Sequence, residues 1–232
     1  MIRIDRFLSD ATGGSRKEVK AWLRAGRVSV DGERVRNAAC QIAEHSVVEL
    51  DGNLVQMQGP RYIMVNKAVG TVCTALHADP RSVLAGMPES PRKPLQCVGR
   101  LDVDTTGLLL VTNDGEWNHR VSRPGHLVKV YRASLAEPLV DTAIEELLGG
   151  VSLRNETRPA VAHSLERVDS RILRIGIREG RYHVVRRMLA AVGNRVTELH
   201  RESIGELALD GRIAPGEWRE LSVRERSLFE PN

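Results

Sequence analysis

Apolar positions recur with helical spacing in the first sixty residues and with strand-like spacing in most of the rest. Two sets each fall on one face of a helix: Ile4, Phe7 and Leu8, and then Val19, Trp22 and Leu23. The sequence Ser15-Arg16-Lys17-Glu18 has the form of a capping box, in which serine accepts from the third backbone amide and glutamate reaches back. We therefore expect the second helix to begin after Ser15 and to end near Ala25, before Gly26.

Short apolar runs between turn residues predict strands. Asp31-Gly32 and Asp51-Gly52 are typical of tight hairpin turns. After a polar linker at 56–60, the larger part of the chain is expected to contain strands at 62–65, 95–98, 108–112, 129–135, 161–168, 172–177 and 196–204, and helices at 116–121, 138–148 and 184–192. Residues 77–94 hold four of the ten prolines and predict a loop.

These elements predict two domains of the α+β class. A small αα-β domain would occupy 1–59, and a larger domain would occupy 60–232. Strands outnumber helices in the larger domain and most connections are short. We therefore expect a mixed, mainly antiparallel β-sheet with flanking helices.

Charge is concentrated in two segments of the chain. The 232 residues carry a net charge of only +4, with 41% hydrophobic residues and 28% charged residues. Residues 16–36 contain seven Lys or Arg against three acidic residues, and residues 178–201 contain six Arg against two Glu. This distribution suggests a polyanionic partner more strongly than the total charge does.

Several classes of function find little support in the sequence. The three cysteines are far apart, so neither a disulfide framework nor a zinc ribbon is expected. No histidine pattern suits a metal, and no phosphate-binding or nucleophile-elbow motif is present. We see no signal peptide, and the longest clearly apolar run, at 108–111, is too short to span a bilayer. A cytoplasmic location is therefore expected.

The second predicted helix carries a basic stripe. Arg16, Lys17, Lys20 and Arg24 fall on one side without an intervening acidic residue, and Arg27 follows. A solvated charged face is the ordinary explanation, and RNA or phosphate binding is the alternative. The stretches IRIDRFL and SRKEVKAWLRAGRVSVDGERV within residues 2–50 resemble an S4 domain, a small RNA-binding module. This resemblance implies that the helix docks on structured RNA.

The stretch VGRLDVDTTGLLLVTNDGE at 98–116 places two carboxylates just before a predicted buried strand. An aspartate in such a loop ordinarily caps backbone amides or pairs with a neighbouring arginine. Asp102 is nevertheless a candidate base or nucleophile, because the basic segment GRYHVVRR at 180–187 could keep it ionised. Asp104 has no comparable partner in the sequence, and we interpret it as a surface or turn residue.

A second resemblance covers nearly the whole chain. It rests on RYIMVNKAVGTVCT at 61–74, GRLDVDTTGLLLVTNDG at 99–115, KVYRASL at 129–135 and LRIGIREGRYHVVRRMLAAVGNRVTELHRESIG at 173–205. The chain resembles the bacterial pseudouridine synthases of the RsuA type, which act on small-subunit (16S) rRNA. The resemblance implies the pseudouridine synthase fold and the isomerisation of uridine to pseudouridine.

The same resemblance assigns roles to individual residues. It implies that Asp102 is catalytic, that Tyr131 stacks on the target uracil and that Arg186 pairs with Asp102. It further implies that Leu173 lines the pocket and that Arg100 fills the gap left by a flipped base. The chain departs from the family at Ala68, where proline is common, and at Val184, where glutamine is common. The second departure puts a glutamine contact in doubt.

The implied reaction breaks the N1–C1′ bond, rotates the uracil and joins C5 to C1′, so no cofactor or metal is expected. Asp102 could attack C1′, add to C6 or remove the 2′ proton. The ending SLFEPN, without a long basic tail, and the S4-like part favour 16S rRNA over 23S rRNA. The expected partner is 16S rRNA, naked or within a partly assembled small subunit, bound by a monomer. The alternatives are a non-catalytic ribosome-assembly protein and a nucleosidase that releases uracil.

Overall fold

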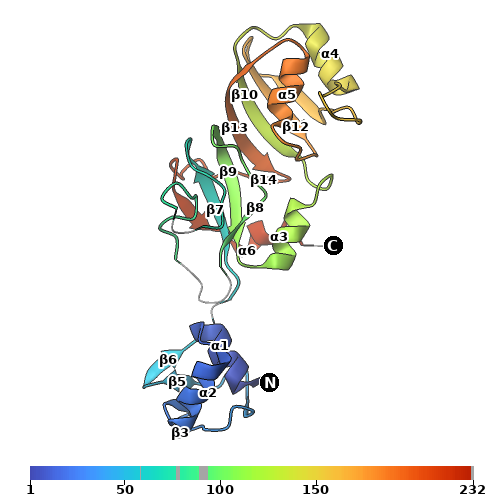
Figure 1. Ribbon diagram of the computed structural model, residues 1–232. Coiled ribbons are helices and arrows are strands. Elements are labelled where there is room, and N and C mark those ends of the chain that lie inside the picture. Colours follow the sequence, from blue (N-terminus) through green and yellow to red (C-terminus); the bar gives the residue numbers. More distant parts are fainter. Residues whose placement is uncertain (58, 77–78, 89–93, 231–232) are drawn as a thin grey trace. The chain divides into compact units, whose positions relative to one another are not determined.

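Figure 1 shows a computed structural model of the protein. The structure describes residues 1–57, 59–76, 79–88 and 94–230. Contacts between Cα atoms divide the chain into two units. The first comprises Met1–Pro60 with Pro88–Leu95, and the second comprises Arg61–Met87 with Gln96–Asn232. No helix in the described part of the chain is long and apolar enough to cross a membrane.

The first unit packs two helices against short antiparallel strands. Its helices are α1 (Ile4–Thr12) and α2 (Arg16–Arg24). Its strands are β1 (Ile2–Arg3), β2 (Val28–Val30), β3 (Glu33–Arg34), β4 (Gln41–Ile42), β5 (Val48–Leu50) and β6 (Asn53–Val55). The strands form a four-stranded sheet in the order β3-β2-β5-β6 and a separate β1-β4 pair. The helical faces meet the sheet in one apolar core: Ile4, Leu8, Val19, Leu23, Val28, Ile42 and Val48.

Local sequence signals account for these elements. The capping box is present, with the Ser15 side chain accepting from the Glu18 amide and the Glu18 carboxylate accepting from the Ser15 amide at 2.8 Å. Both hairpin turns place two consecutive residues at positive φ, namely Asp31-Gly32 and Asp51-Gly52. The capping-box and hairpin predictions are therefore confirmed.

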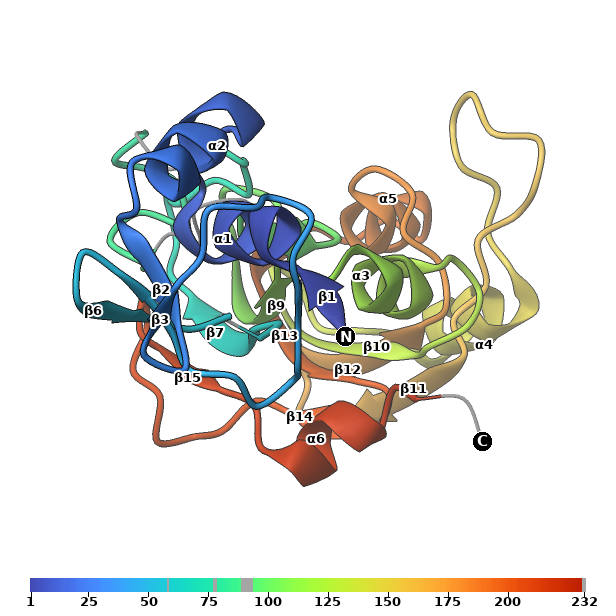
Figure 2. The same ribbon diagram turned by 90° about the horizontal axis from the view of Figure 1, so that it is seen from below.

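The second unit is built on a nine-stranded sheet. Its strands are β7 (Tyr62–Lys67), β8 (Gln96–Val98), β9 (Thr105–Thr112), β10 (Lys129–Leu135), β11 (Ser164–Arg167), β12 (Ile172–Ile177), β13 (Val196–Ile204), β14 (Leu207–Ala208) and β15 (Trp218–Glu220). The main path is β11-β12-β10-β13-β9-β7-β15, with β14 on β13 and β8 on β9. The helices are α3 (Gly115–Ser122), α4 (Asp141–Gly149), α5 (Val184–Ala191) and α6 (Val223–Ser227). In Figure 2, α3 and α5 lie on one side of these strands and α6 lies on the other.

The predicted α+β class with a mixed, mainly antiparallel sheet is confirmed. Among the strand pairs of this sheet in the described residues, only β9 and β13 run parallel. Their pairing joins β10, β11 and β12 to β7, β8 and β15, so the sheet depends on it. Gly107 lies at this junction with a φ of 101°, and a Cβ there would approach the Arg201 carbonyl oxygen to 2.4 Å. Only glycine permits both the backbone conformation and the close approach of the two strands.

Strand register places several polar residues in one transverse row. Across adjacent strands, Lys67 pairs with Gly107, Gly107 with Arg201, and Arg201 with Tyr131. Side chains opposite one another in a sheet point to the same face. The register therefore gathers residues that are 134 positions apart in the chain, from Lys67 to Arg201, on one face.

Sequence patterns did not predict β1, β4, β14, β15 or α6. These strands have only two or three residues, which is too short for an alternating pattern to be recognised. The first strand of the larger unit was predicted to end at residue 65 but continues to Lys67. The predicted loop at 77–94 includes 77–78 and 89–93, which lie outside the described residues.

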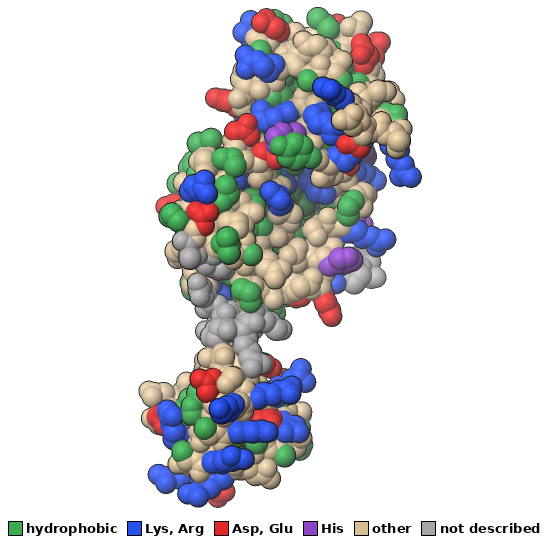
Figure 3. Space-filling view, in the orientation of Figure 1, with side chains coloured by type: hydrophobic (Ala, Val, Ile, Leu, Met, Phe, Trp, Pro, Cys, Tyr) green, Lys and Arg blue, Asp and Glu red, His purple; other side chains and the backbone are tan. Residues whose placement is uncertain are grey.

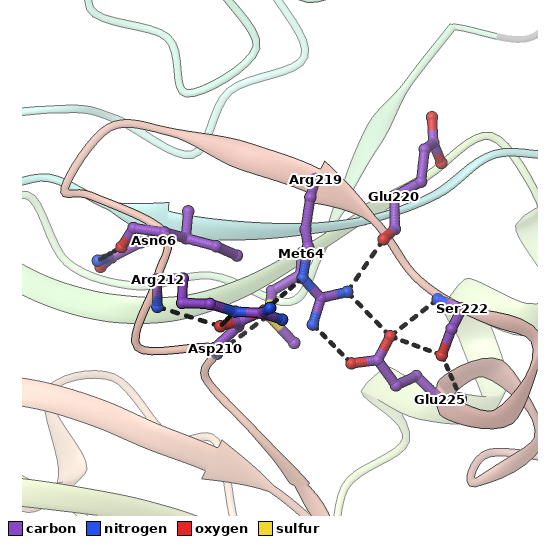
Figure 4. Close-up of polar contacts among 9 residues, drawn as sticks. Met64, Asn66, Asp210, Arg212, Arg219, Glu220, Ser222 and Glu225 are labelled. Carbon is purple, nitrogen blue, oxygen red and sulfur yellow. Dashed lines mark hydrogen bonds and ion pairs between the residues drawn. The ribbon is translucent and has the colours of Figure 1, made fainter.

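A polar network fastens β15 and α6 to the segment before them (Figure 4). Arg219 donates to Asp210 at 2.9 Å and to the two carboxylate oxygens of Glu225 at 2.9 and 2.7 Å. Glu225 also accepts from the Ser222 amide at 2.8 Å and completes the capping box of α6. The hydrogen bonds from Arg219 lower the pKa of Glu225 to about 2, and those from Arg212 and Arg219 lower the pKa of Asp210.

We predict that Glu225→Gln reduces the acid sensitivity of the larger unit. A carboxylate with a lowered folded-state pKa stabilises the fold above its unfolded pKa, and the contribution is lost as pH falls through the folded value. For Glu225 this window lies between about pH 4.5 and pH 2. Urea unfolding at a series of pH values should show that the free energy of unfolding falls less steeply with decreasing pH in the variant. Glu145→Gln, which changes an exposed carboxylate on α4 with no ion pair among the described residues, should retain the original slope.

Candidate active site

The loop that enters β9 is held in a defined shape by backbone contacts. Gly99 adopts a φ of 73°, and the Thr105 amide donates to the Asp102 carbonyl at 3.0 Å, which closes a turn over 102–105. The Gly70 amide donates to the Val103 carbonyl at 2.8 Å. The side chain of Asp102 is 31% exposed, so the carboxylate remains accessible while its backbone is fixed.

Lys67 supports this loop from the interior. It is fully buried, and its ammonium group donates to the carbonyls of Thr105 at 2.9 Å, Ala68 at 3.1 Å and Val103 at 3.3 Å. Burial lowers the pKa of Lys67, and the negative charges of Cys73, Asp104 and Asp102 act in the opposite direction. The three carbonyls match the three donors of an ammonium group, so Lys67 fixes the loop through its backbone.

Two thiols lie behind the same loop. The Cys97 thiol donates to the sulfur of Cys73, and the Leu101 amide lies 3.4 Å from that sulfur. These hydrogen bonds, together with the charge of Lys67, lower the pKa of Cys73 to about 6, whereas the pairing raises the pKa of Cys97. Both thiols are free.

The two carboxylates of the loop contact residues at the start of α5. His183 Nε2, on the residue that precedes the helix, lies 3.3 Å from Asp102 Oδ1, and Arg186 Nη2, in the first turn of the helix, lies 3.0 Å from Asp104 Oδ2. The start of α5 therefore presents one partner to each carboxylate, and Asp102 is oriented by an imidazole.

The structure pairs Arg186 with Asp104, whereas the resemblance implies a pairing with Asp102. Arg186 reaches Asp104 instead, and it also donates to the Val196 carbonyl at 3.3 Å. Asp104, interpreted from the sequence as a residue without a partner, is thus an ion-pair partner. The reason is geometric, since the turn at 102–105 separates the two carboxylates along α5 and brings the earlier one to His183.

His183 carries an uncommon backbone conformation. It precedes α5 with φ of 51° and ψ of 30°, in the left-handed region, and its ring stacks on that of Tyr182 at 3.7 Å between centroids. Such a conformation costs a non-glycine residue about 1 kcal/mol or more and tends to occur at functional sites. The conformation turns the imidazole towards Asp102, which supports a positioning role for His183.

A cavity of about 800 Å³ adjoins the loop. Gly99 and Arg100 form one part of its lining, and Tyr131 on β10 and Arg201 on β13 form another. Asp102 is not among the lining residues, but it follows Arg100 by two positions. The structure therefore brings Arg100 and Tyr131 to one cavity, and Asp102 follows along the same loop.

Arg201 fixes the ring of Tyr131 within this cavity. Its Nη1 lies 3.5 Å from the Tyr131 hydroxyl, and its guanidinium carbon lies 6.0 Å from the ring centroid. Arg201 also donates from Nε to the Leu108 carbonyl at 2.7 Å, so its own position is fixed by β9. Tyr131 is 9% exposed, which leaves part of its surface free to meet a ligand.

Leu173 is buried in the sheet, opposite Ala133. It does not line the cavity, and the residue directly opposite Tyr131 is Ile175. The expected pocket-lining role of Leu173 therefore finds no support in this geometry. A shift of two positions along a strand keeps the face but moves the side chain by about 7 Å.

The basic stripe of α2 is exposed on the first unit (Figure 3). Arg16, Lys17, Lys20 and Arg24 all face solvent. Arg27 differs, because its Nε donates to Asp51 at 2.9 Å, and this contact anchors the second hairpin turn to the end of the helix. The stripe thus presents four positively charged side chains to solvent, whereas the charge of Arg27 is partly neutralised by Asp51.

Sequence reasoning missed three residues of the second unit that the structure places in or beside the site. Lys67 and Arg201 share a sheet row with Tyr131, and His183 contacts Asp102. Each lies within a segment that carries the family resemblance, but only the fold reveals its contact. The described residues contain no group of three or more His, Cys, Asp or Glu that could hold a metal ion.

Comparisons with known proteins indicate the family to which the chain is related. The model of the RNA pseudouridylate synthase family matches residues 61–191, and the S4 domain model matches residues 2–48. The chain is 47% identical to ribosomal small subunit pseudouridine synthase A of Yersinia pestis, covering 97% of this chain and 96% of that protein. It is 46% identical to the protein of the same name from Escherichia coli strain K12, covering 97% and 98%.

A solved structure is similar along its entire length. The chain described as "Crystal structure of pseudouridylate synthase" shares 35% identity and a TM-score of 0.70, covering 99% of this chain and 100% of that chain. Family model, sequence identity and fold thus indicate the same family. The chain belongs to the RNA pseudouridylate synthase family and carries an N-terminal S4 domain.

Proposed function

We propose that this protein converts one uridine of small-subunit (16S) rRNA to pseudouridine, with Asp102 as the reacting carboxylate. The observation that carries the proposal is an accessible aspartate on a rigid loop, whose preceding residues line a cationic cavity that contains Tyr131. The names of the two relatives, which refer to the ribosomal small subunit, support this choice of substrate.

The chemistry matches the arrangement of the site. The N1–C1′ bond breaks, a C5–C1′ bond forms, and the proton lost from C5 is balanced by one gained at N1, so the product is an isomer and no further reactant is consumed. Extruding the uridine from its stack costs a few kcal/mol. Stacking on Tyr131 would recover about 1–3 kcal/mol of this. Arg100, which is exposed and lines the cavity, would fill the gap in the RNA.

The proposed division of labour gives the first unit the docking role. Its exposed basic helix would contact rRNA phosphates, naked or within a partly assembled subunit, while the second unit holds the uridine. Within the second unit, His183 would orient Asp102 and Lys67 would fix the backbone of its loop.

The first prediction of the proposed function concerns Asp102. Asp102→Asn should lower the rate of pseudouridine formation by about 10³-fold or more, because no other group replaces the reacting carboxylate. A deletion strain complemented with each variant would be mapped for pseudouridine in both rRNAs. Asp104→Asn, which alters a carboxylate two residues away, should restore the modification. Wild-type activity in Asp102→Asn would contradict the catalytic role, and loss of a 23S rRNA site alone would contradict the substrate.

Retained RNA binding separates the proposal from its main alternative. Asp102→Asn should bind naked rRNA or an assembly intermediate as tightly as the unaltered protein does. Tight binding by the unaltered protein without isomerisation of any uridine would identify a non-catalytic assembly protein. Release of free uracil would instead identify a nucleosidase.

The second prediction concerns Lys67. Lys67→Met should lower the free energy of unfolding by about 2–4 kcal/mol, because buried carbonyls lose their donor. It should also reduce activity through displacement of the Asp102 loop. Urea unfolding in a Trp22→Phe background would report the larger unit through Trp117 and Trp218. Lys17→Met, an exposed lysine on α2, should leave stability within about 0.5 kcal/mol, and equal losses in both variants would contradict the role of Lys67.

The third prediction concerns the salt dependence of RNA binding. Replacing Arg16, Lys17, Lys20 and Arg24 by Gln should reduce the slope of log K against log salt by about 3, at about 0.7–0.9 for each lost phosphate contact. Arg27→Gln should change the slope less than the average stripe residue, because Asp51 already neutralises Arg27. An unchanged slope in the quadruple variant, with its circular dichroism intact, would show that the stripe does not meet phosphates.

A further inference from the structure

Two of the cations that line the cavity, Arg201 and Lys129, are at least partly buried and have no ion pair with a carboxylate of the described residues. Arg201 is 3% exposed, and its contacts are the Leu108 carbonyl and the Tyr131 hydroxyl, both uncharged. Its Nη2 atom is buried without a hydrogen-bond partner among the described residues. Lys129 lines the same cavity, and its ammonium group donates to the Leu127 carbonyl at 3.2 Å.

The positive charges of Lys129 and Arg201 repel each other, so an anion between them would stabilise both. Lys129 and Tyr131 are alternate residues of β10 and therefore point to one face, the face that Arg201 occupies on β13. Burial and the charge of Arg201 both lower the pKa of Lys129. A buried charge is costly unless it is paired, so the arrangement is stabilised by any anion that enters the cavity.

The acidic residues that line the cavity do not neutralise Arg201 or Lys129. Glu179 pairs with Arg181, and Glu156 is held by Arg187 at 2.9 Å and by Arg181 at 3.6 Å. Both carboxylates are thus engaged at the rim. An anion for Arg201 and Lys129 has to come from the ligand.

We propose that Arg201 and Lys129 form a subsite for a backbone phosphate adjoining the target uridine, occupied while the uracil lies on Tyr131. The subsite rests on the proposed function and extends it. The uracil ring of the substrate is neutral, whereas both neighbouring phosphates carry a permanent charge that suits a guanidinium and an ammonium group. Because Arg201 flanks the Tyr131 ring, it is placed beside a stacked base, where the sugar–phosphate backbone runs. The subsite would fix the ribose during rotation of the detached base.

The first test uses small probes and the full-length protein. The affinities of 5′-UMP, 3′-UMP, uridine and inorganic phosphate would be measured by NMR titration. At least one UMP should bind tenfold or more tightly than uridine, and Lys129→Met should remove most of this difference without weakening uridine. Lys129→Arg should restore it. Arg132→Met removes a cation from the opposite face of β10 and should leave the preference intact.

The second test uses RNA with a single uncharged methylphosphonate on the 5′ or the 3′ side of the uridine. When Lys129 and Arg201 are unaltered, one of the two replacements should weaken binding to the Asp102→Asn protein about tenfold or more. The same replacement should cost less than threefold when Lys129→Met is added, because the contact is already lost. Double-mutant logic then assigns the phosphate to this pair.

Two results would overturn the subsite. One is equal affinity for uridine and both UMPs together with indifference to both methylphosphonates. The other is a preference that survives Lys129→Met while the rate of isomerisation falls, which would mean that the cations act on the detached uracil. Failure of the proposed function has a different signature, because UMP preference would persist while rRNA uridines remained unmodified.

Discussion

The close approach of β9 and β13 at Gly107 is the constraint on which the rest of the larger unit depends. This parallel pair joins two groups of antiparallel strands, and it requires a residue with positive φ and no side chain, because the Arg201 backbone occupies the space of a Cβ. The same row carries Lys67 on one side of Gly107 and Arg201 and Tyr131 on the other. The junction that completes the sheet therefore also determines the spacing of the residues that support the Asp102 loop and those that line the cavity.

The two buried cations of this row, Lys67 and Arg201, differ in how many of their hydrogen-bond donors have partners. This difference distinguishes a cation with a structural role from one that we propose binds a ligand. Lys67 has three carbonyl partners for three donors, so its charge is fully used in fixing the loop. Arg201 has five N–H donors but finds one carbonyl and one distant hydroxyl among the described residues, and it lines the cavity with its Nη2 atom unpaired. Burial is similar for the two side chains, at 0% and 3% exposure, so burial alone would not distinguish them.

Much of the fold and part of the site could be predicted from the sequence. The capping box at Ser15 and the Asp-Gly turns are local signals that act within four residues, and they are found where predicted. Asp102, Tyr131 and Arg100 were selected by resemblance, and the structure places Arg100 and Tyr131 on one cavity beside the Asp102 loop. The partner of Asp102 was not predictable, because Asp104 lies two residues away and His183 lies three before Arg186. The choice between the two possible pairings depends on how the 102–105 turn meets α5.

The proposed action of Asp102 on a polyanion creates an electrostatic conflict, and the larger unit resolves it by distributing charge. Asp102 is placed against a histidine at the start of α5, with Arg186 neutralising the adjacent Asp104, so the loop presents little net negative charge to an approaching phosphate. The cavity next to it is lined by Arg100, Lys129 and Arg201, while its two glutamates are held by arginines. The proposed phosphate subsite and the carboxylate of Asp102 therefore occupy separate places in the larger unit. Because the cations lie on sheet strands and the aspartate lies on a loop anchored by Lys67, this separation is built into the backbone.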